Sequence, residues 1–93
     1  MKVAKKYVIS GRVQMVGYRF FAERVGNELG VCGYVRNLWN GDVEVYAIAD
    51  EATLEEFKRR LAEGPRAARV TRIDESDEAL SSRYKRFEIE GMW

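Results

Sequence analysis

The segment of residues 11–19 has the composition of a loop that binds an anion. Its sequence is GRVQMVGYR, and it connects a predicted strand to a predicted helix. Backbone N–H groups at the start of a helix have no carbonyl partner, and the helix dipole makes this end positive. Gly17 permits backbone angles that turn several amides toward one anion. Arg19, in the first helical turn, adds a planar fork of donors that matches two oxygens of a phosphate.

The position of Arg19 is one that a purely structural helix tends to avoid, because a positive side chain in the first turn opposes the helix dipole. The alternative interpretation is a glycine-containing turn followed by a solvated arginine, since such turns are common between strands and helices. A nucleotide-binding P-loop is not indicated, because Gly17 is followed by Tyr18 and Arg19 instead of lysine and serine or threonine.

Asn37 is a second candidate for the same site. It lies near the end of a predicted strand, and its amide can accept a hydrogen bond from a water and donate one to a phosphate oxygen. Asparagine also commonly opens a turn, and the pair Asn40-Gly41 follows closely. The choice between these interpretations depends on whether the fold brings Asn37 beside the loop.

The residue types that the chain lacks narrow the chemistry. It contains no histidine and one cysteine, Cys32. Imidazole base catalysis, phosphohistidine intermediates, Ser-His-Asp triads and zinc sites built from histidine or four cysteines are therefore excluded. Leu38 stands where cysteine phosphatases have an arginine, so we interpret Cys32 as a small core residue. No cofactor is expected, and any catalysis would depend on positioning and electrostatics.

Length and composition predict one domain spanning residues 1–93. The chain has 46% hydrophobic and 33% charged residues, and its net charge is +1. An anion site must then be local instead of a property of the whole surface. One cysteine suits a reducing compartment, and the N-terminus lacks the apolar run of a signal peptide. We therefore expect a cytoplasmic protein with no membrane partner.

Hydrophobic periodicity predicts the elements that position these residues. Apolar residues alternate in several segments and recur at helical spacing in two others, and Asn40-Gly41 predicts a hairpin turn. Asp50 is expected to cap the second helix and Gly64 to end it. The predicted strands are residues 7–13, 31–38, 43–49, 69–74 and 84–90, the predicted helices are 18–29 and 51–63, and residues 75–83 are expected to form a loop.

This order of elements predicts an α+β fold, a ferredoxin-like βαββαβ sandwich. Two helices cover one face of a mostly antiparallel sheet, and a short extra strand follows at the C-terminus. A right-handed crossover makes the first two strands parallel, so their carboxyl ends meet at one end of the sheet. The loop that leads to Arg19 and the strand end at Asn37 are therefore predicted to be neighbours.

The chain resembles the acylphosphatase family over nearly its whole length. GRVQMVGYR (11–19) resembles the first signature of the family, and GYVRN (33–37) followed by GDV (41–43) resembles its second. GPRAARV (64–70) resembles the segment after the second helix, and FEI (87–89) resembles the final strand. Two signatures at the expected separation are more specific than one glycine motif.

The resemblance implies a hydrolase that splits the carboxyl–phosphate bond of a small-molecule acyl phosphate, giving a carboxylate and inorganic phosphate. It implies no metal and no covalent intermediate, with phosphate or sulfate as a product-like ligand. Arg19 and Asn37 are the implied catalytic residues, and Asn37 positions the attacking water. The implied phosphate-binding residues are Gln14, Met15, Val16, Gly17, Tyr18 and Arg19.

The chain departs from the family pattern at Met15 and Ala49, two positions that usually hold glycine. At Met15 the loop must accept a residue with a side chain, so we expect this position to affect substrate preference more than activity. Ala49 lies near the end of a predicted strand, remote from the predicted chemistry, and its role is expected to be structural.

Two other functions share this order of elements. The RNA-recognition fold needs stacking aromatics on its first and third strands, where this chain offers only Tyr7 and Tyr46, and its basic-Gly-aromatic signature is missing. No nucleic-acid partner is therefore expected. A non-catalytic relative that senses phosphate or binds a partner is disfavoured by Arg19 and Asn37 but stays open. A monomer is expected for a domain of this size.

Overall fold

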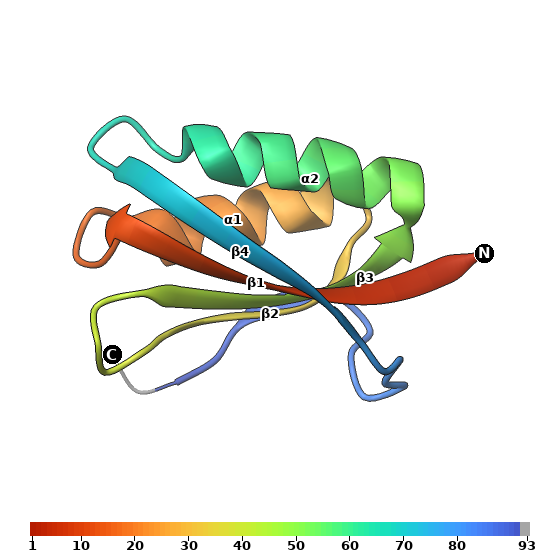
Figure 1. Cartoon of the computed structure of the whole chain (residues 1–93). Coiled ribbons are helices and arrows are strands. Elements are labelled where there is room, and N and C mark those ends of the chain that lie inside the picture. Colours follow the sequence, from red (N-terminus) through yellow and green to blue (C-terminus); the bar gives the residue numbers. More distant parts are fainter. Residues whose placement is uncertain (92–93) are drawn as a thin grey trace.

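The alternating apolar residues form one sheet that packs against two amphipathic helices in the computed structural model, which describes residues 1–91 (Figure 1). Both helices lie on the same face of the sheet, as the sequence predicts. Neither of them is long and apolar enough to cross a membrane. The elements are β1 (Lys2–Arg12), α1 (Tyr18–Glu28), β2 (Cys32–Asn37), β3 (Val43–Asp50), α2 (Glu51–Glu63), β4 (Arg69–Glu78) and β5 (Phe87–Ile89).

The strand order β4-β1-β3-β2-β5 confirms the predicted ferredoxin-like topology. All pairs are antiparallel except β2 with β5, which is the extra C-terminal strand. Val43, at the start of β3, lies opposite Ile9 of β1 and opposite Asn37 of β2. The carboxyl ends of β1 and β2 therefore flank the start of β3, and Figure 1 shows the loop after β1 and the β2–β3 turn at the same end of the sheet.

The core lies between the sheet and the helices. Phe57 of α2 meets Phe87 of β5 edge to face, with ring centroids 5.3 Å apart. Gly26 of α1 packs so closely on Phe87 that a Cβ there would lie 2.6 Å from the ring. Ala49, one of the two departures from the family pattern, is also buried here. The buried residues of this cluster are Tyr7, Ile9, Val13, Tyr18, Ala22, Val25, Val31, Val35, Val43, Val45, Ala47, Ala49, Leu54, Phe57, Leu61 and Phe87.

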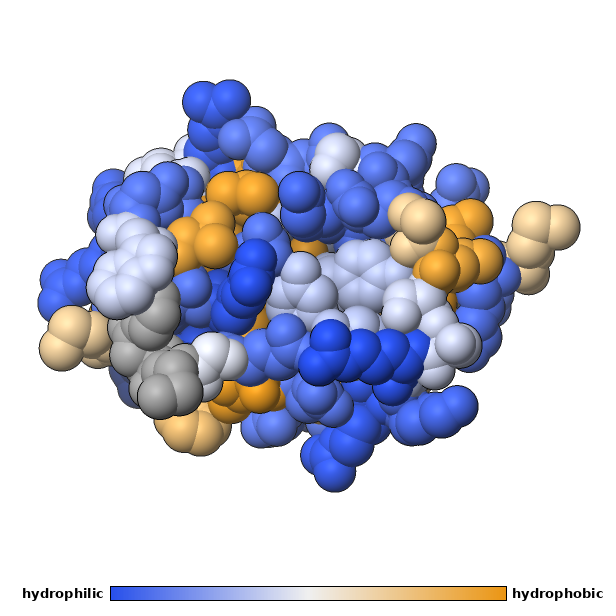
Figure 2. Space-filling model, turned by 90° about the horizontal axis from the view of Figure 1, so that it is seen from below, coloured by the Kyte–Doolittle hydropathy of each residue, from blue (hydrophilic) through white to orange (hydrophobic). Residues whose placement is uncertain are grey.

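A second, smaller apolar cluster lies on the opposite face of the sheet. Tyr34 and Tyr46 stack there with ring centroids 5.6 Å apart, and Tyr84 packs against both. Figure 2 looks at this face and shows a pale centre in a mostly hydrophilic surface. Cys32 is half-buried in this cluster, beside Ala4, Tyr46 and Ile48. This position agrees with the interpretation of Cys32 as a packing residue.

Three strands differ clearly in extent from the sequence prediction, and one of them is the last strand, which spans Phe87–Ile89 instead of 84–90. β1 begins at Lys2, and β4 continues to Glu78 where a loop was expected. These polar segments pair with each other, because Lys5 lies opposite Asp77 and its Nζ is 3.0 Å from Glu75 and from Asp77. Asp50 does stand at the N-cap of α2, but it makes no side-chain capping hydrogen bond. Its Oδ1 instead faces the N-terminal amine at 3.4 Å.

Candidate functional site

A small pocket lies at the end of the sheet where β1 and β2 finish. Its volume is about 130 Å³, which is enough for a phosphate-sized ion. Arg19 and Asn37, which are distant in the sequence, both line it. The other lining residues are Val13, Met15, Gly17, Tyr18 and Phe20. Of the residues that the sequence implied for phosphate binding, Gln14 and Val16 do not line this pocket.

The loop between β1 and α1 bends through two residues with left-handed backbone angles. Met15 has φ 62° and Gly17, the N-cap of α1, has φ 80°. Within residues 1–91, the amides of residues 15–19 donate no backbone hydrogen bond, and the amide of Phe21 is the one that bonds to Gly17 O, at 3.1 Å. The first turn has no acidic residue and no side-chain cap. The start of α1 therefore keeps both its donors and its positive dipole potential for an anion.

Tyr18 anchors this turn to the rest of the protein. Its side chain is 1% exposed, and its hydroxyl donates to Leu61 O of α2 at 2.7 Å. Burial raises the pKa of the Tyr18 hydroxyl well above its ordinary value, so the group is a neutral structural donor. Because Tyr18 is held in the core, the backbone of the adjacent Arg19 has a fixed position at the pocket.

Arg19 is partly exposed and belongs to the pocket wall. In the described part of the chain, no carboxylate lies within ion-pairing distance of it. Arg24, on the same helix, is different because it pairs with Glu28 at 2.9 Å. The charge of Arg19 is therefore available to a bound anion.

Asn37 ends β2 at the pocket and is only 8% exposed. The turn that follows it is closed by hydrogen bonds from Leu38 N to Asp42 O at 2.9 Å and from Gly41 N to Leu38 O at 3.2 Å. Gly41 has φ 98°, as the Asn-Gly turn signal requires. The asparagine thus combines a turn position with a place in the pocket wall, so its two interpretations do not exclude each other.

Gln14 connects the loop to this turn. Its Nε2 donates to Leu38 O at 2.7 Å and to Asp42 O at 2.9 Å. The side chain of Gln14 is therefore engaged with the β2–β3 hairpin. The bridge holds the segment that leads to Arg19 against the hairpin that follows Asn37. Nothing in the local sequence predicts this contact.

Phe20 is a pocket residue that the sequence analysis did not identify. It is 70% exposed, although it lies on an amphipathic helix with an apolar face that includes Tyr18, Ala22 and Val25. Helical spacing places Phe20 on the side of α1 opposite this apolar face, and that position was the available signal.

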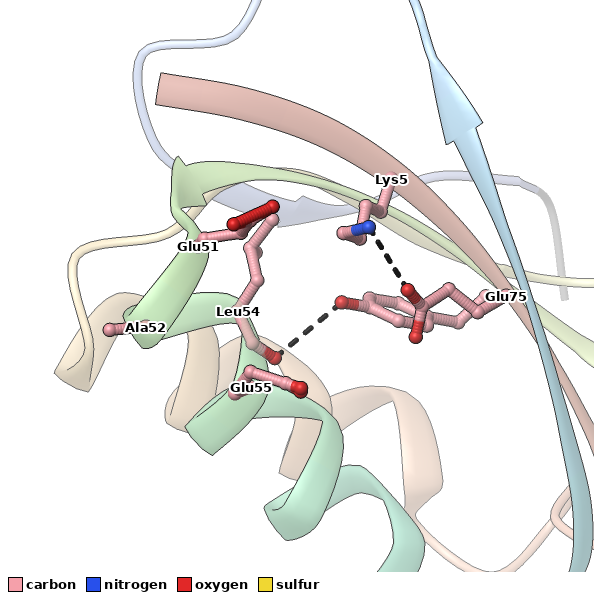
Figure 3. A pocket seen from close by; sticks show the side chains of 7 residues that line it. Lys5, Glu51, Ala52, Leu54, Glu55 and Glu75 are labelled. Atoms are coloured by element: carbon pink, nitrogen blue, oxygen red, sulfur yellow. Dashed lines mark hydrogen bonds and ion pairs between the residues drawn. The ribbon is translucent and has the colours of Figure 1, made fainter. Parts of the chain in front are cut away.

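A wider pocket of about 320 Å³ lies near the start of α2, and its one basic residue, Lys5, is already paired with Glu75 and Asp77. Figure 3 shows Lys5 paired with Glu75. The hydroxyl of the buried Tyr7 donates to Leu54 O at 3.5 Å. Glu51 and Glu55 add negative charge to its wall. This pocket therefore disfavours a phosphate, whereas the pocket at Arg19 favours one.

Comparison with known proteins agrees with the geometry. A family model described as acylphosphatase matches residues 5–89. An acylphosphatase of Koribacter versatilis is 42% identical over 89 residues, which are 96% of this chain and 81% of that relative. One from Archaeoglobus fulgidus is 41% identical and covers 94% of this chain and 97% of that relative. The crystal structure of acylphosphatase from Bacillus subtilis matches with a TM-score of 0.91 and 28% identity, over 98% of this chain and 100% of that one.

Proposed function

Because the chain belongs to the acylphosphatase family and hydrolyses the carboxyl–phosphate bond of acyl phosphates, we propose that Arg19 and the amides of residues 15–19 bind the phosphate while Asn37 positions the attacking water. The observation that carries the proposal is the shared pocket, whose wall contains the loop, Arg19 and Asn37.

Phosphate binding would depend on charge and on preorganised donors. The amides at the start of α1 and the guanidinium of Arg19 would neutralise charge on the equatorial oxygens of the phosphoryl group. The anchored Tyr18 and the bridge from Gln14 keep these donors in place before substrate arrives. Donors that are already oriented need little reorganisation during the reaction, and this lowers the barrier.

The hydrolysis would need no strong general acid. The leaving group is a carboxylate, which departs from phosphorus without being protonated first. The Asn37 amide would accept a hydrogen bond from a water and hold it in line with the bond that breaks. Water would attack phosphorus directly, so the P–O bond to the acyl group breaks as the bond to water forms, and no phosphorylated residue is involved.

Steady-state kinetics on acetyl phosphate with excess EDTA test this assignment. We expect wild-type hydrolysis to persist without metal. Arg19→Ala should lower kcat/KM by about 10²–10³-fold and raise the Ki for inorganic phosphate, because the main fixed charge of the site is lost. Arg24→Ala is the matched control, since Arg24 lies on the same helix but pairs with Glu28 at 2.9 Å. It should retain wild-type kinetics.

Asn37→Ala separates water positioning from phosphate binding. We expect kcat to fall about 10²-fold while the Ki for phosphate changes far less, because the loop donors stay in place. Near-wild-type turnover by Asn37→Ala would contradict its role. A wild-type protein that binds phosphate but hydrolyses no acyl phosphate would instead be the phosphate-sensing module of the alternative hypothesis.

We further propose that the protein acts as a cytoplasmic monomer. The single Cys32 supports a reducing compartment, and the complete pocket within one chain supports activity without a partner subunit. Light scattering during size exclusion should give a mass close to 10.8 kDa. A stable dimer would contradict this.

A further inference from the structure

Two large apolar side chains are exposed beside the phosphate pocket. Within residues 1–91, the exposed large hydrophobic residues are Met1, Met15, Phe20, Trp39 and Leu80. Met15 is fully exposed, Phe20 is 70% exposed, and both line the pocket that contains Arg19. Single exposed apolar residues are ordinary, but two of them beside one small pocket that also contains Arg19 and Asn37 need an explanation.

The size of the pocket indicates where the phosphate and the acyl group of a substrate would lie. At about 130 Å³ it is well below the several hundred cubic ångströms that enclose a larger ligand, so it has room for the phosphate but not for the acyl group as well. The acyl group must then emerge through the mouth. Most of the other lining side chains are buried, so the exposed surface that it meets there includes Met15 and Phe20.

The backbone at Met15 strengthens this argument. Its φ of 62° lies in the left-handed region, where glycine is comfortable and a residue with a side chain is strained. The side chain also makes no contribution to the core, because it is fully exposed. Neither folding nor loop geometry explains a methionine here, whereas contact with a ligand does.

We propose that Met15 and Phe20 form an apolar lip beside the pocket. This lip contacts the acyl group of the substrate. The lip gives the enzyme a preference for acyl phosphates with aromatic or branched aliphatic acyl groups over those with small or charged ones. When the acyl group packs on this lip, part of its apolar surface is removed from water. This burial contributes binding energy in proportion to the buried area. This inference rests on the proposed function, because it requires the phosphate to occupy the pocket at Arg19.

The test compares kcat/KM for benzoyl phosphate with kcat/KM for acetyl phosphate. The two acyl phosphates differ in intrinsic reactivity, so the informative quantity is the change of this ratio between variants. We expect Phe20→Ala and Met15→Asn each to lower the ratio about three- to tenfold, chiefly through the KM for benzoyl phosphate. Asparagine tolerates the left-handed backbone, so Met15→Asn removes the apolar side chain without imposing new strain.

Two further variants serve as controls. Met15→Leu keeps an apolar side chain at the lip and should keep most of the preference for benzoyl phosphate. Leu80→Ser removes a large apolar residue that is 61% exposed but lines a different pocket, with Lys2 and Val3. It should leave the ratio unchanged.

The outcomes distinguish this inference from the function on which it rests. If the wild type hydrolyses acetyl phosphate and Arg19→Ala abolishes this, but neither lip variant changes the ratio, the lip is refuted and the proposed function stands. If the wild type hydrolyses neither acyl phosphate, the proposed function fails first. A fall in the ratio that is as large for Leu80→Ser as for Phe20→Ala would also refute the lip.

Discussion

Gln14 joins the loop that carries Arg19 to the hairpin that follows Asn37, so its replacement tests whether the relative position of these two residues limits catalysis. Gln14→Met is the sharpest perturbation. It keeps the length of the side chain and the backbone amide of the loop, and it removes the donors that reach Leu38 O at 2.7 Å and Asp42 O at 2.9 Å.

The expected loss of stability follows from those two hydrogen bonds. Each is worth about 0.5–1.5 kcal/mol net. Both acceptors keep another partner, because Leu38 O also accepts from Gly41 N and Asp42 O also accepts from Leu38 N. No carbonyl is therefore left without a donor. The free energy of unfolding should fall by about 1–2 kcal/mol, in the lower part of the range expected for two hydrogen bonds.

The expected kinetic effect is larger than the loss of stability suggests. A shift of the hairpin by a fraction of an ångström to one ångström would misalign the water that Asn37 is proposed to position, and such misplacement lowers turnover by up to about 10²-fold. We expect kcat to fall roughly 10- to 100-fold. The Ki for inorganic phosphate should change by less than about threefold, because the loop amides and Arg19 remain.

Urea unfolding and initial rates on acetyl phosphate measure both effects, with Asn27→Leu as the matched control. Asn27 also makes two side-chain-to-backbone hydrogen bonds, donating to Phe87 O at 3.0 Å and accepting from Phe87 N at 2.9 Å. It joins the end of α1 to β5, away from the pocket. We expect a similar loss of stability and wild-type kcat.

Two results would refute this reasoning. Wild-type kcat in Gln14→Met, together with the expected loss of stability, would show that the bridge is only structural. An equal loss of kcat in Gln14→Met and Asn27→Leu would show that activity follows general stability and not the position of Asn37.

Other predictions concern the fold and its pH dependence. Gly33→Ala should cost more than about 4 kcal/mol or prevent folding, measured by thermal unfolding, because its Cβ would lie 1.8 Å from Tyr46 O at a φ of 144°. Burial raises the pKa of Tyr7 to about 12, so Tyr7 stays protonated in the folded chain where it ionises in the unfolded one. The free energy of unfolding should therefore fall as pH rises above about 10, and Tyr7→Phe should flatten this slope in urea titrations. Hydrogen bonds from Lys58 and Lys5 lower the pKa of Glu75, so its contribution is present above its ordinary pKa and is lost as pH falls below it. Glu75→Gln should make unfolding less sensitive to acid between about pH 5 and pH 3.

Most of the fold could be predicted because burial of one face of each helix or strand places apolar residues at regular intervals in the sequence. α1 buries Tyr18, Ala22 and Val25, and α2 buries Leu54, Phe57 and Leu61, at the helical spacing that predicts both elements. The turn at Asn40-Gly41 also occurs as predicted, since Gly41 adopts a positive φ that few other residues adopt without strain.

The extent of the polar strands could not be predicted. The last part of β4, through Glu78, has no apolar alternation, and its place in the sheet comes from pairing with β1. The ion pairs of Lys5 with Glu75 and Asp77 add to that pairing. Such stabilisation involves residues that are far apart in the chain, so no local pattern reveals it. The missing side-chain cap at Asp50 could not be predicted for the same reason, because its carboxylate faces the distant N-terminal amine instead of the first turn of α2.

The sequence by itself determined the chemistry that this protein can use. Absence of histidine, the glycine before the helix and Arg19 in its first turn restrict the site to charge and backbone donors, because residue type alone sets which groups can donate, accept or ionise. Only the tertiary structure decided which of these groups meet. Strand register places Asn37 beside the loop, Gln14 turns to the hairpin instead of the pocket, and Met15 and Phe20 stand at its mouth. Those contacts depend on how distant segments pack, and packing is a property of the whole chain.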